Sequence, residues 1–322
     1  MRQKIPTQRI GLVLLDGFAL MSYAALIEPF RAANVLADAP LYSWQHIAAG
    51  AAGAASNGAR IVADARSGQV GLAGELDMVF VFAGGDPRGG EDAGLFAWLR
   101  RLARQGVTVG GVSAGPYVLA QAGLLAGRRA TIHWEHVPAM QAAFPEVALE
   151  GGLYVIDGRV ITCAGGTAGL DLALALIRRD HGEALAGRVG EWFIRTAARE
   201  AEGPQRPRPA ERHGTTNGAV LAALALMEAH VAAPLPREQV ARRVGLSLRQ
   251  LERLFVAHQG RSLAEAGMAI RLAAAAHALR TTDAPVTSVA LDCGFASAAH
   301  FARRFAAAYG AAPARWRRHA AP

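Results

Sequence analysis

The chain has 322 residues, of which 52% are hydrophobic and 19% charged, and its formal net charge at pH 7 is +8. This length exceeds what a single hydrophobic core usually supports, so we expect two domains. The sequence contains no run of about 18 apolar residues that would span a membrane. The two cysteines, Cys163 and Cys293, and the ten histidines form no disulfide framework or metal-ligand motif. We therefore expect a cytoplasmic protein with no membrane contact, metal or cofactor.

The positive charge is confined to the C-terminal part of the chain. Residues 204–322 contain 16 arginines against seven carboxylates, a net charge of +9, whereas the preceding residues carry a net charge of −1. A genomic preference for arginine over lysine does not explain this asymmetry. The pattern is typical of a nucleic-acid-binding domain joined to a near-neutral one.

Between residues 10 and 198, short apolar runs alternate with longer helical patterns. The expected strands are residues 10–15, 43–48, 78–82, 107–112, 153–156 and 159–163. The expected helices are residues 22–34, 93–105, 115–122, 133–144, 166–180 and 183–198. Continuous apolar strands between amphipathic helices predict an α/β domain, a flavodoxin-like parallel sheet sandwich covered on both faces. Ligands of such a domain bind beyond the carboxyl ends of the strands.

Two glycine-rich motifs follow predicted strands. Gly111, Ser113 and Gly115 form a G-x-S-x-G sequence between a strand and a helix, which is the sequence form of a nucleophile elbow. Gly84 and Gly85 end the preceding strand, where glycine lets backbone N–H groups approach a ligand closely. We expect the two motifs to form one small polar site.

The region after residue 200 predicts a linker and then a second domain. Residues 201–218 contain three prolines and three glycines and show no periodicity, which is typical of a linker. The expected domains are therefore residues 1–200 and 219–322. The second is expected to be all-helical.

Residues 240–255 predict a helix-turn-helix unit. Ala241 lies four residues before Gly245, and Ser247 and Gln250 form an S-x-x-Q capping box at the start of the next helix. That second helix is the one expected to enter the major groove of DNA. Its expected base-facing residues are Ser247, Arg249, Gln250 and Arg253.

The same pattern recurs at residues 290–309, so the chain contains an internal repeat. Ala290 again precedes a glycine, Gly294, by four residues, and Ser297 opens the next helix. Three aromatic residues at i, i+4 and i+8 make one face of this helix apolar and leave its arginines on the other. These aromatic residues are Phe301, Phe305 and Tyr309. The expected base-facing residues are Ser297, Ala298, His300 and Arg303, and the expected phosphate contacts are Arg304, Arg315, Arg317 and Arg318.

The last hundred or so residues resemble the DNA-binding domain of the AraC/XylS regulators. The residues that carry the resemblance are Gly294, Phe295, Ser297, Phe301, Arg303, Phe305, Gly310, Pro313, Trp316 and Arg317. The resemblance implies two helix-turn-helix units joined by one long helix at about residues 264–280. It also implies double-stranded promoter DNA, RNA polymerase and a second copy of the chain, as a homodimer, among the partners.

The first domain resembles the PfpI/ThiJ class I amidotransferase-like domain, and the whole chain is similar to the GlxA-type regulators that fuse this domain to an AraC-type one. The matching segments are residues 27–34, 42–45, 56–58, 122–131, 133–136, 144–147 and 162–167. Within that family the chain is most similar to regulators of carnitine and glycine-betaine catabolism. The resemblance implies a transcriptional regulator, an activator, of genes for the catabolism of a small amine or quaternary ammonium.

Ser113 leaves two functions open for the first domain. The enzymes that this domain resembles carry Cys at the elbow followed by His, whereas this chain has Ser113 and Ala114, and His133 is the remaining candidate base. A PfpI-like hydrolase or amidotransferase-like enzyme that uses Ser113 is therefore the alternative to a binding pocket without turnover, which is the function we expect. The residues expected to bind the effector are Glu28, Gly84, Gly85, Ser113, Ala114, His133 and Trp134.

A quaternary ammonium effector needs aromatic faces, because it has no N–H to donate. The aromatic candidates are Trp134, Trp44, Phe18, Phe82 and Tyr117, and Glu28 would supply negative charge. An arginine-like or other amine fits the same residues. We expect binding of this small-molecule effector to change the arrangement or dimerisation of the DNA-binding domains.

Overall fold

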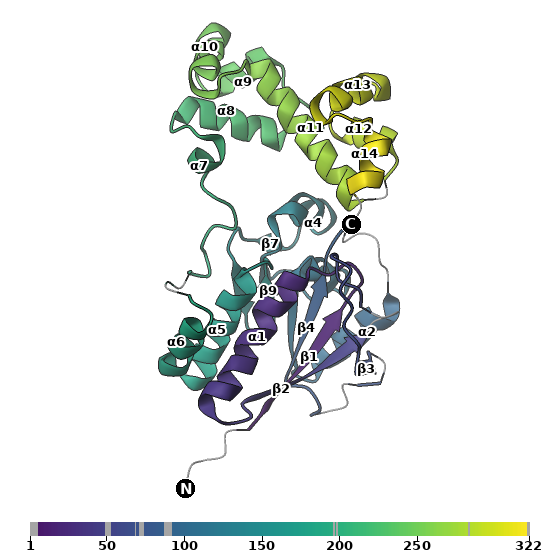
Figure 1. The fold of residues 1–322 in the computed structure, drawn as a ribbon, viewed down its shortest axis with the longest axis vertical. Helices are drawn as coiled ribbons and strands as arrows, with labels where there is room; N and C mark the ends of the chain where they lie inside the picture. Colours follow the sequence, from purple (N-terminus) through teal and green to yellow (C-terminus); the bar gives the residue numbers. More distant parts are fainter. Residues whose placement is uncertain are drawn as a thin grey trace. The chain divides into compact units, whose positions relative to one another are not determined.

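The computed structural model describes residues 6–48, 53–67, 69–70, 74–86, 92–195, 197, 199–282 and 284–320. The chain divides into two compact units, Met1–Arg206 and Pro207–Pro322 (Figure 1). The first is an α/β unit and the second is helical. Within the described residues, no helix is both long and apolar enough to cross a lipid bilayer.

The first unit is built on a seven-stranded sheet with the order β3-β2-β1-β4-β5-β9-β8 (Figure 1). Its strands are β1 (Gln8–Leu14), β2 (Tyr42–Ala48), β3 (Ala65–Arg66), β4 (Met78–Ala83), β5 (Thr108–Ser113), β8 (Tyr154–Asp157) and β9 (Val160–Cys163). Neighbouring strands are parallel except for β8 and β9. A separate parallel pair consists of β6 (Arg129–Ala130) and β7 (Ala148–Leu149). The carboxyl ends of β1, β4, β5 and β9 therefore lie at one edge of the sheet.

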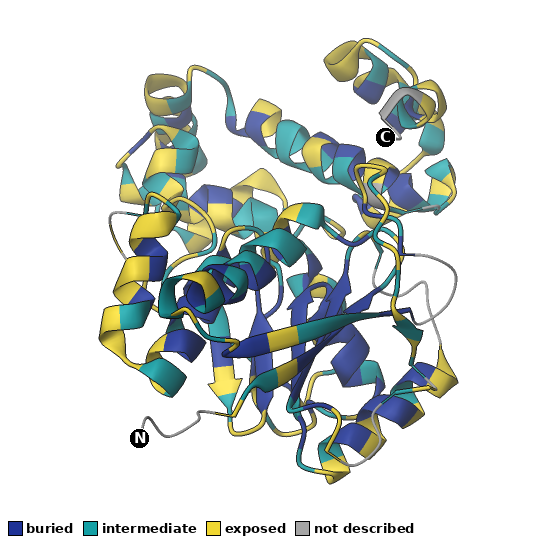
Figure 2. Cartoon of the chain, turned by 60° about the horizontal axis from the view of Figure 1, so that its bottom comes forward, coloured by how far each residue is buried: buried dark blue, intermediate teal, exposed yellow. Residues whose placement is uncertain are grey.

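Helices cover both faces of this sheet. They are α1 (Leu20–Ala37), α2 (Ala93–Arg104), α3 (Gly115–Gln121), the 3-10 helix Trp134–His136, α4 (Val137–Ala143), α5 (Ala168–His181) and α6 (Glu183–Trp192). Successive residues of β4 point to opposite faces. Phe80 and Phe82 pack with α1 and α5, while Val79 and Val81 pack with α2 and α3. The central strands are therefore buried on both sides, as the dark blue sheet in Figure 2 shows.

The predicted sheet sandwich is confirmed, with corrections in detail. The sheet is not wholly parallel, because Gly158, at a φ of 62°, allows a tight hairpin that makes β8 and β9 antiparallel. The helix predicted at residues 133–144 begins as a 3-10 turn and continues as α4, and the helix predicted at residues 183–198 ends at Trp192. Strands β3, β6 and β7 were not predicted, since each pairs over two residues and has no apolar run.

The second unit contains two helix-turn-helix units that share one long helix. Its helices are α7 (Pro209–His213), α8 (Gly218–Ala229), α9 (Arg237–Arg243), α10 (Leu248–Gln259), α11 (Leu263–Thr281), α12 (Val286–Asp292), α13 (Ala298–Tyr309) and α14 (Pro313–Ala320). Phe255 of α10 lies in one apolar core and Phe305 of α13 in another. Helix α11 enters both, with Leu263 in the first and Leu279 in the second. It therefore fixes the spacing of the two helix-turn-helix units, as expected for the helix predicted at residues 264–280.

The segment predicted as a linker, residues 201–218, contains the boundary between the two units, and its residues bond to both sides of that boundary. Ala201 packs on the first unit, where its carbonyl oxygen accepts a hydrogen bond from Leu153 N at 2.6 Å. Helix α7 belongs to the second unit, where Arg212 pairs with Glu228 of α8 at 3.2 Å. Proline and glycine content shows where regular structure is weak, but not which distant groups the backbone and side chains of a segment contact.

The sharp turn between β5 and α3 depends on Gly115, because a Cβ there would overlap the Val81 carbonyl oxygen of β4. We expect Gly115→Ala to lower the free energy of unfolding by roughly 1–3 kcal/mol through overpacking. Gly187→Ala is the matched control, since its site in α6 is open and alanine favours a helix by about 0.5–1 kcal/mol. Urea denaturation of the full chain measures both. Equal midpoints for the two variants would contradict the close approach.

Candidate functional site

The G-x-S-x-G sequence adopts the strained turn that its spacing predicts. Ser113 has a φ of 63°, in the left-handed region. This backbone conformation is energetically unfavourable for residues other than glycine. A Cβ at Gly111 would lie 2.6 Å from Pro116 N, and one at Gly115 would overlap Val81 O. Both glycines are therefore needed for the chain to reverse from β5 into α3. The turn has the geometry of a nucleophile elbow.

Loops from several strands meet at Ser113, beyond the carboxyl ends of the sheet. Ala114 N donates to Ala83 O at the end of β4, and His133 N donates to Ser113 O, each at 3.2 Å. Gly165, in the turn after β9, lies so close that a Cβ there would be 2.7 Å from Ser113 Cβ. Gly84 packs against the backbone of the turn after β1. The structure thus brings Gly84, Ser113, Ala114 and the backbone of His133 into one region, next to Gly85 and Trp134 in the chain.

Ser22 of α1 belongs to this region and was missed from the sequence. It is 2% exposed, and its Oγ accepts a hydrogen bond from Gly166 N at 2.7 Å. A single serine in an apolar helix gives no signal of its own. Glu28, the acid predicted for the site, lies further along α1, where it pairs with Arg31 at 2.7 Å. Ser22, rather than Glu28, is thus the α1 residue that contacts the glycine turn beside Ser113.

The polar groups around Ser113 form no nucleophile–base pair in the described part of the chain. Among those residues, no hydrogen bond uses the Ser113 hydroxyl. His133 Nδ1 lies 3.6 Å from Glu135 Oε2, and its ring is tilted against that of Trp134 at 5.4 Å. Covalent catalysis by serine needs a base within hydrogen-bond reach. Among the described residues, the Ser113 hydroxyl is therefore not hydrogen-bonded to such a base.

The aromatic candidates divide into buried residues and one exposed ring. Phe18 and Phe82 are fully buried or nearly so, and both pack edge-on against Tyr23, at 6.0 and 5.7 Å. The predicted Trp44 is partly buried against the same core. Tyr117, also predicted, packs in the core on the other face of the sheet. Trp134, at 39% exposure, is the candidate with an accessible ring.

Tyr23 begins a polar chain behind these rings. Its hydroxyl lies 2.8 Å from His46 Nε2, and His46 Nδ1 lies 3.2 Å from Asp64 Oδ2. Burial raises the pKa of the Tyr23 hydroxyl, and hydrogen bonds from His46 lower the pKa of the Asp64 carboxyl. Neutral tyrosine and ionised aspartate are thus both favoured near neutral pH.

In the second unit, α10 turns its apolar side chains inward and its arginines outward. Gln250 N donates to Ser247 Oγ at 3.3 Å and Ser247 N donates to Gln250 Oε1 at 3.0 Å, which is the predicted capping box. Leu251 is fully buried, whereas Arg249 and Arg253 are exposed. The Gln250 side chain is engaged in the cap. Arg249 and Arg253 place two positive charges on the exposed face of α10.

Helix α13 repeats this arrangement. The Phe301 and Phe305 rings lie 5.3 Å apart and those of Phe305 and Tyr309 4.5 Å apart, as the i, i+4, i+8 spacing predicts. Arg303 and Arg304 are exposed on the opposite side. Arg303 is the sixth residue after the cap of α13, which is the position that Arg253 holds in α10.

The remaining predicted contacts of α13 lie at its start. His300 N donates to Ser297 Oγ at 3.2 Å, so Ser297 caps the helix. The His300 ring is half-buried and its Nε2 lies 3.5 Å from Arg304 Nε. Ala298 is half-buried and offers a methyl group, not a polar one.

Some arginines of the second unit hold the fold together. Arg317 donates to the carbonyl oxygens of Leu279 at 3.2 Å and Ala284 at 2.6 Å. It thereby satisfies the end of α11, and its predicted contact with a phosphate stays a prediction. Arg271 donates to Gly294 O at 2.7 Å, and burial lowers the pKa of its guanidinium. The basic charge of this unit is therefore divided between structural and exposed positions.

Comparisons with known proteins identify both parts of the chain. Residues 8–179 match the DJ-1/PfpI family, and residues 240–319 match a helix-turn-helix domain. The HTH-type transcriptional regulator GlxA of Rhizobium meliloti is 42% identical over 97% of this chain and 96% of its own. The HTH-type transcriptional regulator CdhR of Pseudomonas aeruginosa is 40% identical over 95% and 90%. The chain belongs to this family of HTH-type transcriptional regulators.

The regulator therefore joins a DJ-1/PfpI domain to an AraC-type DNA-binding domain, as the sequence motifs predicted. A crystal structure of an AraC family transcriptional regulator from Pseudomonas putida has the same fold over 58% of this chain and 99% of its own, with a TM-score of 0.52 at 24% identity. Within the described residues of the regulator, no group of three or more His, Cys, Asp or Glu side chains is placed to hold a metal ion.

The strain at Ser113 predicts how the regulator tolerates substitution there. Ser113→Ala should change the free energy of unfolding by no more than about 0.5 kcal/mol, since no described hydrogen bond uses the hydroxyl. Ser113→Val should cost about 1–3 kcal/mol, because a β-branched side chain tolerates a positive φ poorly and Gly165 leaves no room for it. Thermal unfolding of the full chain compares the two. A valine variant as stable as the alanine variant would show that the elbow is not strained.

Proposed function

We propose that the regulator binds a specific promoter duplex through α10 and α13, and that a small amine or quaternary ammonium bound near Ser113 controls this binding and activates transcription. The observation that carries the proposal is the matched pair Arg253 and Arg303, each exposed at the same position after a serine cap. Arginine can bind guanine O6 and N7 with two hydrogen bonds.

The rigid helix between the two units supports readout of a long site. Helix α11 contributes buried residues to both helix-turn-helix cores. Two recognition helices held in this way can enter successive turns of the major groove, about 34 Å apart. One chain would thus read two half-sites, and a homodimer would read more than two. RNA polymerase, next to such a site, is the partner that an activator needs.

The Ser113 region supports a sensor more than an enzyme. The glycine turns and Ser22 supply close backbone groups and a hydroxyl, and Trp134 supplies an exposed ring. These are the parts of a small-molecule site. A hydrolase would need a base on the Ser113 hydroxyl, which the described residues do not provide. We therefore propose ligand binding without turnover.

The regulator should lose affinity for its duplex when either matched arginine is removed. Arg253→Ala and Arg303→Ala should each weaken binding by roughly 1–3 kcal/mol if the side chain contacts a base. The duplex is one selected by the wild-type protein from a random pool, and fluorescence anisotropy gives the Kd at several salt concentrations. Arg101→Ala, which removes the same charge from the exposed side of α2, is the control. Equal Kd values for all four proteins would refute the assigned interface.

Glycine betaine, carnitine or arginine should stabilise the full chain against heat if the effector is an amine. A ligand at about 100 times its Kd adds roughly 2.7 kcal/mol to the free energy of unfolding. The matched control for glycine betaine is 3,3-dimethylbutyrate, which has the same shape without the positive charge. Stabilisation by both would exclude cation recognition, and consumption of the bound amine, followed by NMR, would exclude a pure sensor.

A further inference from the structure

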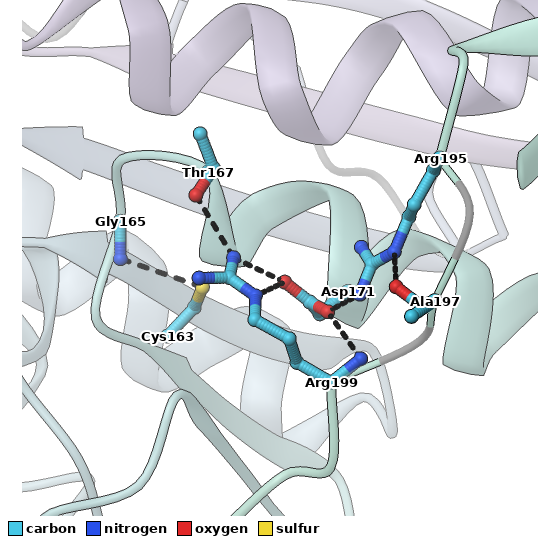
Figure 3. Close-up of polar contacts among 7 residues, drawn as sticks. All are labelled: Cys163, Gly165, Thr167, Asp171, Arg195, Ala197 and Arg199. Atoms are coloured by element: carbon cyan, nitrogen blue, oxygen red, sulfur yellow. Dashed lines mark hydrogen bonds and ion pairs between the residues drawn. The ribbon is translucent and has the colours of Figure 1, made fainter. Parts of the chain in front are cut away.

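Residues 199–206, here called the strap, are the last part of the first unit and precede α7 in the chain. The strap begins at Arg199, which pairs with Asp171, a fully buried carboxylate that also pairs with Arg195 (Figure 3). Arg199 Nη2 donates a further hydrogen bond to Thr167 Oγ1 at 2.8 Å. A buried carboxylate without partners is costly, so this end of the strap is held firmly on α5.

The middle of the strap lies against the loop before β8. Leu153 N donates to Ala201 O at 2.6 Å, and a Cβ at Gly152 would lie 2.5 Å from the same oxygen. The side-chain nitrogen of Gln205 lies 3.0 Å from Ile132 O and 2.8 Å from Gly152 O. The strap is thus bonded to the rest of the first unit along its length.

The strap ends with a cation on an aromatic ring. The guanidinium carbon of Arg206 lies 4.2 Å from the ring centroid of Trp134. Indole is the ring that attracts cations most strongly, because its face is negative. Arg206 therefore holds the position that a cationic ligand of Trp134 would take.

The anchors of the strap lie next to the Ser113 site. Thr167 belongs to the turn after β9, which packs against Ser113. Ile132 directly precedes His133, whose backbone bonds to Ser113 O, and Trp134 directly follows it. The loops that form the wall of the site are therefore the loops on which the strap lies.

We propose that the strap reports the occupancy of the Ser113 site to the DNA-binding unit, with Arg206 as an internal cation on Trp134 that a cationic effector displaces. The inference rests on the proposed function, since it requires an effector at that site. Displacement frees the end of the strap that leads into the second unit. The bound and released strap are then the two states whose balance the ligand shifts.

The size of the effect follows from the strength of the contact. A cation over an exposed aromatic ring contributes about two- to fivefold to an equilibrium constant. Removing either partner should therefore release the strap about two- to fivefold more often. The ion pair of Arg199 with Asp171 keeps the strap attached at its first residue, while the part from Ala201 to Arg206 opens.

The test uses the full chain and two pairs of variants. Arg206→Gln removes the internal cation, and Trp134→Leu removes the ring. Arg208→Gln and Trp192→Leu are the matched controls, since they make the same changes at exposed residues outside the strap. Hydrogen exchange at the Leu153 amide, which donates to the strap, and the Kd for the selected duplex are measured for each protein.

We expect the first pair to speed exchange at Leu153 about two- to fivefold and to shift the duplex Kd, and the controls to leave both unchanged. Equal exchange in Arg206→Gln and Arg208→Gln would overturn the proposal. Faster exchange at Leu153 with an unchanged duplex Kd would also overturn it, because release of the strap would then have no effect on DNA binding.

Exchange measured with glycine betaine distinguishes a failure of the strap proposal from a failure of the proposed function. In the wild type, betaine should speed exchange at Leu153 while 3,3-dimethylbutyrate does not, and Trp134→Leu should abolish the response. Betaine that binds and leaves exchange at Leu153 unchanged would overturn the displacement of Arg206. If betaine, carnitine and arginine all fail to bind, the amine effector of the proposed function and the competition at Trp134 are both refuted. The four variants still decide whether the strap is coupled to DNA binding.

Discussion

The organisation of the first unit depends on one buried carboxylate, Asp171. It lies in the first turn of α5, has no exposed side-chain surface, and pairs with Arg195 and Arg199 from the segment after α6. Removing one partner from such a group typically costs about 3–5 kcal/mol, because the remaining charge stays buried. The first turn of a helix also favours an anion. Asp171 thus ties the end of the first unit to the glycine turn that forms one wall of the Ser113 site.

In the second unit, the two small helical cores must keep a fixed spacing. Helix α11 fixes this spacing, because it contributes Leu263 to one core and Leu279 to the other. Arginine serves two purposes around this helix. Arg317 satisfies carbonyl groups at the end of α11, while Arg253 and Arg303 remain exposed. Arg253 and Arg303, the residues proposed to contact DNA, are thus exposed rather than bonded to these carbonyl groups.

The sequence was sufficient for the features that local patterns encode. Apolar runs located the six longer strands to within a residue or two, and the serine caps located α10 and α13. It was insufficient where a role depends on a distant partner. Nothing in the residues around Asp171 indicates Arg195 and Arg199, and the prolines after residue 201 suggested a linker where Ala201 bonds to Leu153. The contact of Ser22 with Gly166 exists only in the folded chain, whereas Glu28 was chosen from the sequence because its position resembles that of a pocket glutamate in the family.

In the proposed function, a ligand of the first unit and a duplex bound by the second unit each change the affinity for the other. Thermodynamic linkage makes this measurable in both directions, because each must change the Kd of the other by the same factor. Isothermal titration of the full chain with glycine betaine, with and without the selected duplex, and of the duplex with and without betaine, gives the two factors. We expect the two factors to be equal and to lie between about 5 and 150. Two tight binding events with Kd values that are independent of each other would contradict this expectation.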